Sequence, residues 1–137
     1  MTLFVDSSTF YAAADRTDRS NTRAKALVAT DEILVTTDHV VVETWLLLHR
    51  RIGRHGAEAF WAGLTSGGTR IEAVGPADLE VAWSIGELFP DKDFSIVDRT
   101  SFAVMQRLGV HRVATFDDDF AIYRFGPRRS RAFEVVR

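Results

Sequence analysis

Thr2-Leu3-Phe4-Val5-Asp6 opens the chain with a short apolar run that stops at a carboxylate. The run has the length and composition of a buried β-strand. A similar run, Val113-Ala114-Thr115-Phe116, stops at Asp117. In a parallel α/β sheet, ligands bind at the carboxyl ends of the strands, where residues far apart in the sequence converge. We therefore expect these two acids to meet at one edge of a sheet.

The rest of the chain alternates strand and helix patterns. The expected strands are Thr2–Val5, Ile33–Thr36, Arg70–Val74, Arg112–Thr115 and Arg131–Val136. The expected helices are Ser7–Asp15, Thr22–Ala29, Asp38–Arg51, Ala57–Leu64, Ala77–Leu88 and Ile96–Leu108. Asp38 is expected to cap its helix, and Gly53 to end it. The alternation predicts an α/β fold with a parallel sheet and right-handed crossovers.

The composition is that of one folded domain, residues 1–137, and 46% of the residues are hydrophobic. The formal net charge of -2 does not indicate a nucleic-acid binder, but it leaves room for a local basic face. No cysteine is present, which excludes disulfides and zinc-thiolate sites. We find no apolar run that could span a membrane and no signal peptide, so a cytoplasmic protein is expected.

Two further acids lie in helical patterns. Glu43 interrupts the apolar segment from Val40 to Leu48, which we expect to be buried on all sides. A buried glutamate needs a partner, because an isolated buried charge is costly. Asp98 follows Ser95 at the spacing of a capping box, which would explain it as a purely structural residue. The two roles are compatible, since one carboxylate oxygen can cap while the other faces a metal ion.

Each of the other acids also has a structural explanation. Asp6 could cap the helix that follows it, and Asp117, Asp118 and Asp119 could form a solvated loop. These explanations weaken when taken together, because the acids fall at the same kind of boundary between strand and helix. Several carboxylates in one pocket repel each other unless a hard divalent cation holds them. The sequence therefore indicates a magnesium or manganese site.

Four segments resemble the PIN domain, and within it the VapC-type toxins of bacterial toxin–antitoxin pairs. The segments occur in the order of the family and cover essentially the whole chain. They are Val5-Asp6-Ser7-Ser8, Thr37-Asp38-His39-Val40-Val41-Val42-Glu43, Asp93-Phe94-Ser95-Ile96-Val97-Asp98-Arg99-Thr100-Ser101-Phe102 and Thr115-Phe116-Asp117-Asp118-Asp119-Phe120. The resemblance implies a three-layer α/β/α sandwich with a central parallel sheet of about four to five strands. It also implies a ribonuclease that depends on Mg²⁺ or Mn²⁺ and is inhibited by a cognate antitoxin protein.

On this reading the catalytic residues are Asp6, Glu43, Asp98 and Asp117. Asp6 and Asp98 are expected to bind the metal directly, and Asp117 directly or through water. Glu43 would bind a second metal ion or orient the attacking water. Residues expected to orient these ligands are Ser7, Ser95, Thr115 and Asp119. The abundance of tryptophan and phenylalanine, together with the resemblance, predicts a homodimer.

An acidic pocket repels RNA, so a basic rim is expected beside it. Arginines also stack on unpaired bases, which suits single-stranded or looped RNA as the substrate. The predicted RNA-binding residues are Arg50, Arg51, Arg54, Arg128 and Arg129, with His55, Arg124 and Arg131 as further candidates. Alternatively, these residues are ordinary solvated surface residues with no role in RNA binding. The four histidines show no metal-ligand spacing.

Other functions remain open at this point. A housekeeping nuclease of the same fold, or a non-catalytic interaction module, would share most of these features. A DNA-directed nuclease would use the same carboxylates, since metal-assisted hydrolysis does not involve the 2′-hydroxyl. A phosphate-receiving regulatory domain would need a lysine after the last strands, and Lys92 is the last lysine in the chain.

Overall fold

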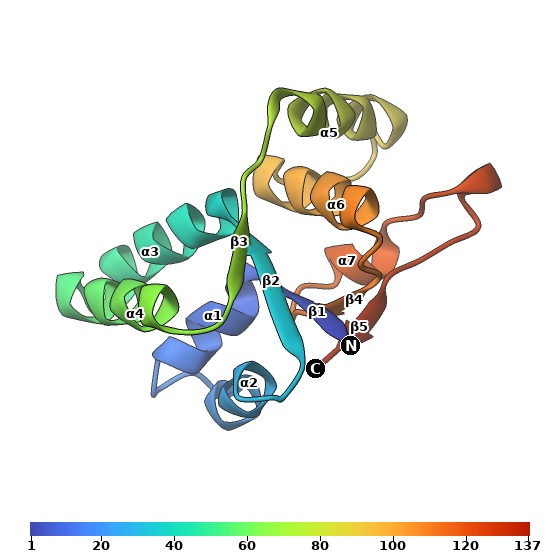
Figure 1. Ribbon diagram of the computed structural model, residues 1–137. Helices are drawn as coiled ribbons and strands as arrows, with labels where there is room; N and C mark the ends of the chain where they lie inside the picture. Colours follow the sequence, from blue (N-terminus) through green and yellow to red (C-terminus); the bar gives the residue numbers. More distant parts are fainter.

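The computed structural model describes residues 1–137, and at its centre lies a five-stranded sheet in the order β3-β2-β1-β4-β5 (Figure 1). Every pair of neighbouring strands is parallel. The strands are β1 Thr2–Val5, β2 Ile33–Thr37, β3 Arg70–Glu72, β4 Arg112–Ala114 and β5 Glu134–Val136. The parallel sheet predicted from the sequence is confirmed, and the first strand has the predicted bounds.

Seven helices cover the sheet on both faces. They are α1 Ser7–Ala14, α2 Asn21–Val28, α3 Asp38–Ile52, α4 Arg54–Ser66, α5 Pro76–Leu88, α6 Ile96–Leu108 and α7 Asp119–Ile122. Helices α1 to α4 lie on one side of the sheet and α5 to α7 on the other (Figure 1). This division follows from right-handed crossovers, because the chain runs outward from β1 to β3 and then returns past β1 to β4 and β5. The three-layer sandwich is confirmed.

The strand order reverses direction between β1 and β4. The crossover from β1 leads to one side and the crossover into β4 arrives from the other, so the loops after these two strands diverge and leave a crevice. Val5 pairs with Ala114 in the register of the two strands. Asp6 and Thr115 consequently leave the sheet side by side, and the crevice lies directly above them.

The core around this crevice is rich in aromatic side chains. Phe4, Phe102 and Phe120 are fully buried. The ring of Phe102 stacks on that of Tyr123 at a centroid distance of 4.3 Å and meets Phe120 edge-on at 5.0 Å. Both geometries are favourable for aromatic pairs. They fix α6 against α7, the two helices that carry Asp98 and Asp119.

Some local predictions were wrong. The cap of α3 is Thr37, whose hydroxyl accepts from the Val40 amide at 3.1 Å, and Asp38 is the first helical residue. The Asp38 carboxylate accepts from the His39 amide in the first turn and from the amide of Val74, both at 3.0 Å, and the second bond ties the helix to the end of the neighbouring strand. The short helix α7 was not predicted, because four residues cannot show a helical period.

The prediction that the segment from Val40 to Leu48 is buried on all sides was also wrong. Only Val40, Thr44 and Leu48, spaced four residues apart, are fully buried, while Val41, Trp45 and Leu47 pack against the core with part of their surface. Val42 is 57% exposed and Leu46 is 56% exposed. The helix covers one side of the sheet and has an open outer face, despite its apolar sequence. No helix of the protein is long and apolar enough to cross a membrane.

Candidate active site

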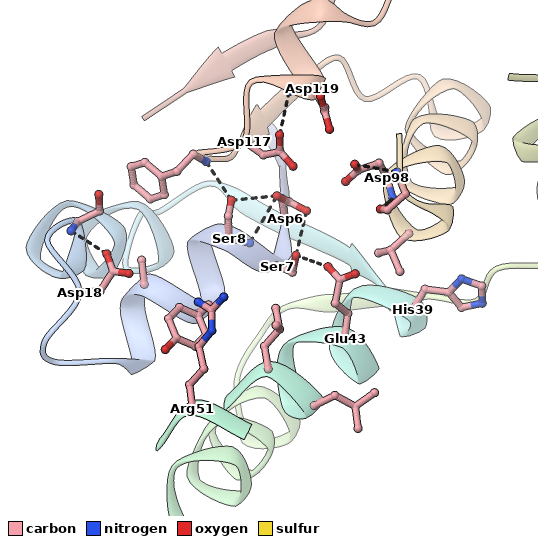
Figure 2. Close-up of a pocket in the computed structure, with 18 of the residues that line it drawn as sticks. Asp6, Ser7, Ser8, Asp18, His39, Glu43, Arg51, Asp98, Asp117 and Asp119 are labelled. Atoms are coloured by element: carbon pink, nitrogen blue, oxygen red, sulfur yellow. Dashed lines mark hydrogen bonds between the residues drawn. The ribbon is translucent and has the colours of Figure 1, made fainter. Parts of the chain in front are cut away.

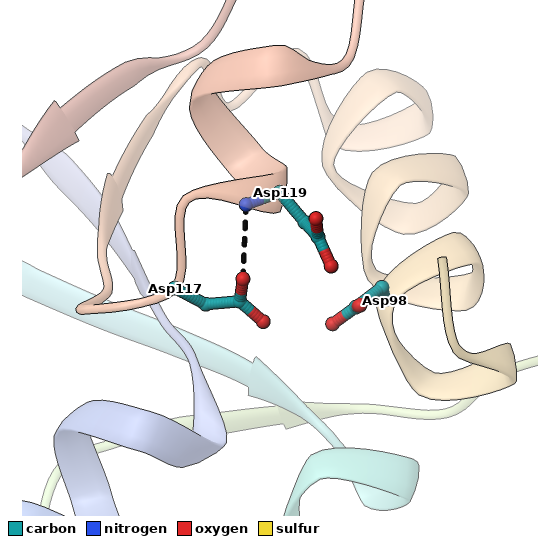
Figure 3. A group of neighbouring side chains, drawn as sticks. All are labelled: Asp98, Asp117 and Asp119. Atoms are coloured by element: carbon teal, nitrogen blue, oxygen red, sulfur yellow. Dashed lines mark hydrogen bonds between the residues drawn. The ribbon is translucent and has the colours of Figure 1, made fainter. Parts of the chain in front are cut away.

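Three carboxylates converge at the crevice (Figure 3). One oxygen each from Asp98, Asp117 and Asp119 can be chosen so that all three lie within 4.8 Å of one another. Asp98 comes from the first turn of α6, while Asp117 and Asp119 come from the loop after β4 and the start of α7. The structure therefore brings together Asp98 and Asp117, two of the predicted metal ligands. Beside them it places Asp119, which was predicted to orient the ligands rather than to bind the metal itself.

Backbone hydrogen bonds fix two of these carboxylates, those of Asp98 and Asp117. The Asp98 carboxylate accepts from the Ser95 amide at 3.3 Å, and the Ser95 hydroxyl accepts from the Asp98 amide at 3.0 Å. This reciprocal capping box holds the first turn of α6. On the opposite side, the Asp117 carboxylate accepts from the Asp119 amide at 2.9 Å. The capping role and the place in the acidic cluster coexist in Asp98, as the sequence allowed.

Asp6 lies beneath the cluster and is 2% exposed. Its carboxylate accepts from the Ser8 hydroxyl at 2.9 Å (Figure 2) and from the Thr115 hydroxyl, also at 2.9 Å. Those hydroxyls in turn accept from the next loop: Ser8 from the Phe116 amide at 2.9 Å, and Thr115 from the Asp117 amide at 3.0 Å. Asp6 thus holds the loop that presents Asp117. Its carboxylate is not one of the three that converge, so its role as a direct metal ligand stays a prediction.

Glu43 reaches the same crevice from α3. One of its carboxylate oxygens accepts from the Ser7 hydroxyl at 2.5 Å, and Ser7 also lies 3.4 Å from the Asp6 carboxylate (Figure 2). Glu43 is only half-buried, and its second oxygen makes no hydrogen bond within the protein. The carboxylate therefore does not need a buried partner, and one of its oxygens is free to act in the pocket.

Burial and mutual repulsion make the acidic cluster reluctant to ionise. Burial, followed by the neighbouring Asp117 and Asp6 carboxylates, raises the pKa of Asp98 to about 8. Burial also raises the pKa of Asp119, with Asp117 as the next cause. For Asp6, burial raises the pKa even though hydrogen bonds from Thr115 and Ser8 oppose the shift. Carboxylates in such surroundings gain most from a bound cation.

Comparison with known proteins identifies the family. Residues 3–126 match the PIN domain. The chain belongs to the PIN-domain family. It is 39% identical over 125 residues to the 23S rRNA-specific endonuclease VapC20 of Mycobacterium tuberculosis, in strains CDC 1551 / Oshkosh and ATCC 25618 / H37Rv. That alignment covers 90% of this chain and 95% of VapC20.

The fold agrees with the same relative. The crystal structure of Mycobacterium tuberculosis VapC20, described as a Sarcin-Ricin loop cleaving toxin, superposes with a TM-score of 0.82 at 36% sequence identity. The superposition covers 88% of this chain and 93% of that structure. The resemblance seen in four short motifs therefore extends to nearly the whole PIN domain.

The pocket of this PIN domain has a volume of about 970 Å³ and combines acidic and basic walls. Its lining includes Asp6, Glu43, Asp98, Asp117 and Asp119 together with Arg19, Arg50 and Arg51. Ser7, Ser8, Ser95 and His39 line it as well. All four predicted catalytic residues thus share one pocket, although they come from four separate segments of the sequence.

The predicted basic rim is only partly at the pocket. Arg50 and Arg51 line it, but Arg54 turns to Glu58 at 3.4 Å on the exposed side of α4. Arg128 and Arg129 lie on the arm between α7 and β5, away from the pocket lining (Figure 1). The guanidinium carbon of Arg129 sits 5.0 Å from the ring centre of Phe89. The sequence could not show that the arm carrying Arg128 and Arg129 lies away from the pocket.

Two residues that contribute to the pocket were not predicted from the sequence. Ser8 connects Asp6 with the loop after β4, and the signal for it was the pair of hydroxyls that follows Asp6. Arg19 reaches the pocket from the loop between α1 and α2. Nothing in the sequence near Arg19 distinguishes it from the other exposed arginines.

The cluster fits a divalent cation in its chemistry. Its donors are carboxylate oxygens, which Mg²⁺ and Mn²⁺ prefer. Asp98, Asp117 and Asp119 take part in no ion pair with a lysine or an arginine. Three uncompensated acids within 4.8 Å are therefore available for a metal ion.

Proposed function

We propose that this PIN domain is a ribonuclease toxin that depends on Mg²⁺ or Mn²⁺ and cleaves the sarcin–ricin loop of 23S rRNA. The observation that carries the proposal is the cluster of Asp98, Asp117 and Asp119 at the floor of the pocket. The substrate is taken from VapC20, which shares 39% of its residues with this chain over nearly the full length of both proteins.

In the mechanism, Asp98, Asp117 and Asp119 would hold the cation. When bound, the cation neutralises charge on the scissile phosphate and lowers the pKa of a coordinated water. Glu43 would accept a proton from the attacking water, because it is half-buried, keeps one oxygen free and is oriented by Ser7. Asp6 would act through Ser8 and Thr115, which fix the loop that carries Asp117.

The basic residues would supply the affinity for RNA. Arg50 and Arg51 would contact the strand within the pocket. Arg128 and Arg129 would contact phosphates outside it, on the exposed arm after α7. Such contacts give most of the salt-dependent affinity of proteins for nucleic acids. They provide local positive charge on a chain whose net charge is -2.

The direct test uses a hairpin RNA with the sarcin–ricin loop sequence and purified protein. We expect cleavage at one linkage in the loop with Mg²⁺ or Mn²⁺, and none with excess chelator. Attack by water leaves a terminal phosphate and a hydroxyl, whereas attack by the 2′-hydroxyl leaves a 2′,3′-cyclic phosphate. Metal-independent cleavage, or cyclic phosphate ends, would rule out this mechanism. A matched DNA hairpin shows whether the enzyme distinguishes RNA.

We further propose that a cognate antitoxin inhibits the protein by covering the pocket. The uncompensated carboxylates suit an arginine side chain, whose planar fork matches carboxylate oxygens. Such an arginine would occupy the cation position and exclude RNA at the same time. Expression of this chain alone should arrest growth, and co-expression of the neighbouring gene should restore it. A chain that is harmless when expressed alone would favour a housekeeping nuclease.

A further inference from the structure

A second network of side chains lies in the same pocket, apart from the acidic cluster. Tyr11 on α1 and Arg51 in the last turn of α3 both line the pocket. Figure 2 draws Arg51 well away from Asp98, Asp117 and Asp119. The proposed hydrolysis does not use Tyr11 or its partner Asp15, although both are buried.

The partners of Asp15 fix Tyr11 in place. The Tyr11 hydroxyl donates to one Asp15 oxygen at 2.7 Å, and the other oxygen accepts from the amide and hydroxyl of Thr17 at 3.0 and 2.7 Å. The Tyr11 hydrogen bond, followed by those from Thr17, lowers the pKa of Asp15. Burial raises the pKa of Tyr11. Asp15 is therefore an anion and Tyr11 a neutral donor, which makes their bond charge-assisted and strong.

Tyr11 in turn supports Arg51. The guanidinium carbon of Arg51 lies 5.1 Å from the centre of the Tyr11 ring, within the range of a cation–π contact. An exposed arginine is otherwise flexible, and ordering it costs conformational entropy. Arg51 makes no ion pair with a carboxylate. The ring contact and the negative charge of Asp15, whose pKa Arg51 helps to lower, restrain the guanidinium near Tyr11. Its N–H groups remain available to an incoming anion.

We propose that Arg51, positioned by Tyr11 and Asp15, forms a subsite that binds a non-scissile phosphate of the RNA strand. The inference deepens the proposed ribonuclease function and rests on it. A pocket of about 970 Å³ is large enough for more than one nucleotide. An RNA strand with its scissile phosphate at the acidic cluster would extend through the same pocket and bring a neighbouring phosphate to the arginine.

The basic residues of the pocket outnumber the acids near Arg51. Arg19 and Arg50 line the same pocket as Arg51, and the nearby acids are Asp18, which lines it, and Asp15, whose pKa the Arg51 charge helps to lower. One oxygen of Asp18 accepts from the Ser20 amide at 2.8 Å, which keeps that carboxylate bound to its own loop. The guanidinium fork matches two phosphate oxygens at once. Tyr11 and Asp15 are positioning residues here, since they act on RNA only through Arg51.

Binding measured in chelator tests the subsite without cleavage. The probe is a fluorescent hairpin RNA with the sarcin–ricin loop sequence, and the readout is its anisotropy. Loss of a charge-assisted contact in Arg51→Gln should weaken binding about 10-fold. Tyr11→Phe keeps the ring but frees it from Asp15, and should weaken binding about 3-fold. Arg51→Lys should recover only part of the loss, because lysine lacks the planar fork.

Arg54→Gln is the matched control. It removes the same charge one helix further on, at an exposed residue that does not line the pocket. Its binding should stay within about 2-fold of wild type if the effect of Arg51 is more than net charge. Thermal unfolding of every variant separates loss of the subsite from loss of the fold. Arg51→Gln alters only an exposed side chain, so it remains informative even if Tyr11→Phe is unstable.

Two results mark a positioning role. The double variant Tyr11→Phe/Arg51→Gln should bind no worse than Arg51→Gln alone, because Tyr11 acts through the arginine. A neutral methylphosphonate at one non-scissile linkage should weaken binding to wild type and leave Arg51→Gln unaffected. In cleavage assays the loss should fall on KM, with kcat changed less than about 2-fold.

The outcomes separate the two proposals. If wild type cleaves the hairpin but Arg51→Gln binds like Arg54→Gln, the subsite is refuted and the ribonuclease stands. If wild type binds the hairpin with these differences yet cleaves no RNA, the ribonuclease fails and the subsite stands. If the variants bind RNA normally but lose affinity for polyglutamate, the site serves an acidic peptide and the phosphate assignment is overturned.

Discussion

Asp117 and Asp118 are adjacent in sequence, but their surroundings differ in a way that activity should reveal. Asp117 belongs to the cluster of three carboxylates. Asp118 is 78% exposed and pairs with Arg137 at 3.0 Å. Asp117→Asn should lower kcat/KM by at least about 100-fold, because a cation held by fewer carboxylates binds weakly. Asp118→Asn should stay within about 2-fold of wild type, since an exposed ion pair contributes little. Equal activity of the two variants would remove Asp117 from the metal site.

Asp98 should make the stability of the metal-free protein depend on pH. Its pKa rises from 3.8 to about 8 on folding, so the folded state favours the protonated acid. Between about pH 4 and pH 8 the unfolded chain ionises at Asp98 before the folded chain does, and stability falls across that window. Asp98→Asn removes this loss. In chelator, the variant should therefore gain in Tm over wild type as the pH rises from about 5 to about 8.

The same titration should make cation binding stronger at higher pH. Below about pH 8 a cation must displace the proton from Asp98. The Mn²⁺ affinity of wild type, measured by calorimetry, should therefore rise between pH 6 and pH 8 by up to about 10-fold per unit. For the stability prediction, the contradicting result is a difference in Tm between wild type and Asp98→Asn that stays constant from about pH 5 to about pH 8. Asp98 would then be ionised over that whole range in the folded protein.

At the residue scale, the sequence could predict which acids meet in one pocket but not how their carboxylates are arranged there. Asp6, Glu43, Asp98 and Asp117 were recognised because each falls near a strand end or a helix start, and all four line one pocket. The sequence could not show that Ser8 and Thr115 take up one Asp6 oxygen, while Asp119 turns toward Asp98. Those orientations depend on the register of β1 against β4, which no local pattern encodes.

At the scale of elements, the cap of α6 should matter for both stability and activity. The Ser95 hydroxyl accepts from the Asp98 amide at 3.0 Å. Ser95→Ala should destabilise the protein by about 1 kcal/mol and lower Tm by a few degrees. The first turn of α6 would also hold Asp98 less firmly, so kcat should fall more than KM rises. Ser84→Ala, which removes an exposed helical hydroxyl on α5, is the control and should change neither quantity. An unchanged Tm in Ser95→Ala would show that the cap does not hold the helix.

Elements with a clear period were predictable, and those that depend on their neighbours were not. Helix α6 has the predicted bounds, Ile96–Leu108, because Ser95 caps it and Gly109 adopts the left-handed conformation that ends it. Helix α7 has too few residues to show a period and forms around the Asp117 turn. For α3 the apolar composition was misleading, since Val42 and Leu46 face outward. Composition alone does not show which side of a helix the sheet covers.

At the scale of the whole molecule, the exposed apolar side chains of α3 and α5 predict a homodimer. Val42 and Leu46 on α3 are more than half exposed, and on α5 Trp83 is 70% and Leu88 54% exposed. Large apolar side chains on a protein surface often mark interfaces between chains. An interface on these helices would border the pocket, because Val42 and Leu46 also line it. The sequence showed only that aromatic residues are abundant, whereas the apolar side chains exposed on these two helices are aliphatic apart from Trp83.

Light scattering at micromolar concentration should give a mass twice that of the 15.4 kDa chain. The double variant Leu46→Glu/Trp83→Glu should give the mass of one chain, because charges buried at an interface cost several kcal/mol. Trp61 lies on α4 and is 50% exposed, so Trp61→Glu makes a similar change on another helix and should leave the dimer intact. A wild-type mass of 15.4 kDa would exclude the dimer. Dissociation caused by Trp61→Glu alone would move the interface to α4. Because Leu46 lines the pocket, activity is compared in Trp83→Glu alone, which lies outside the lining. If that variant is monomeric and still cleaves RNA at the wild-type rate, each pocket is complete within one chain, as expected because Asp6, Glu43, Asp98 and Asp117 all come from the same copy.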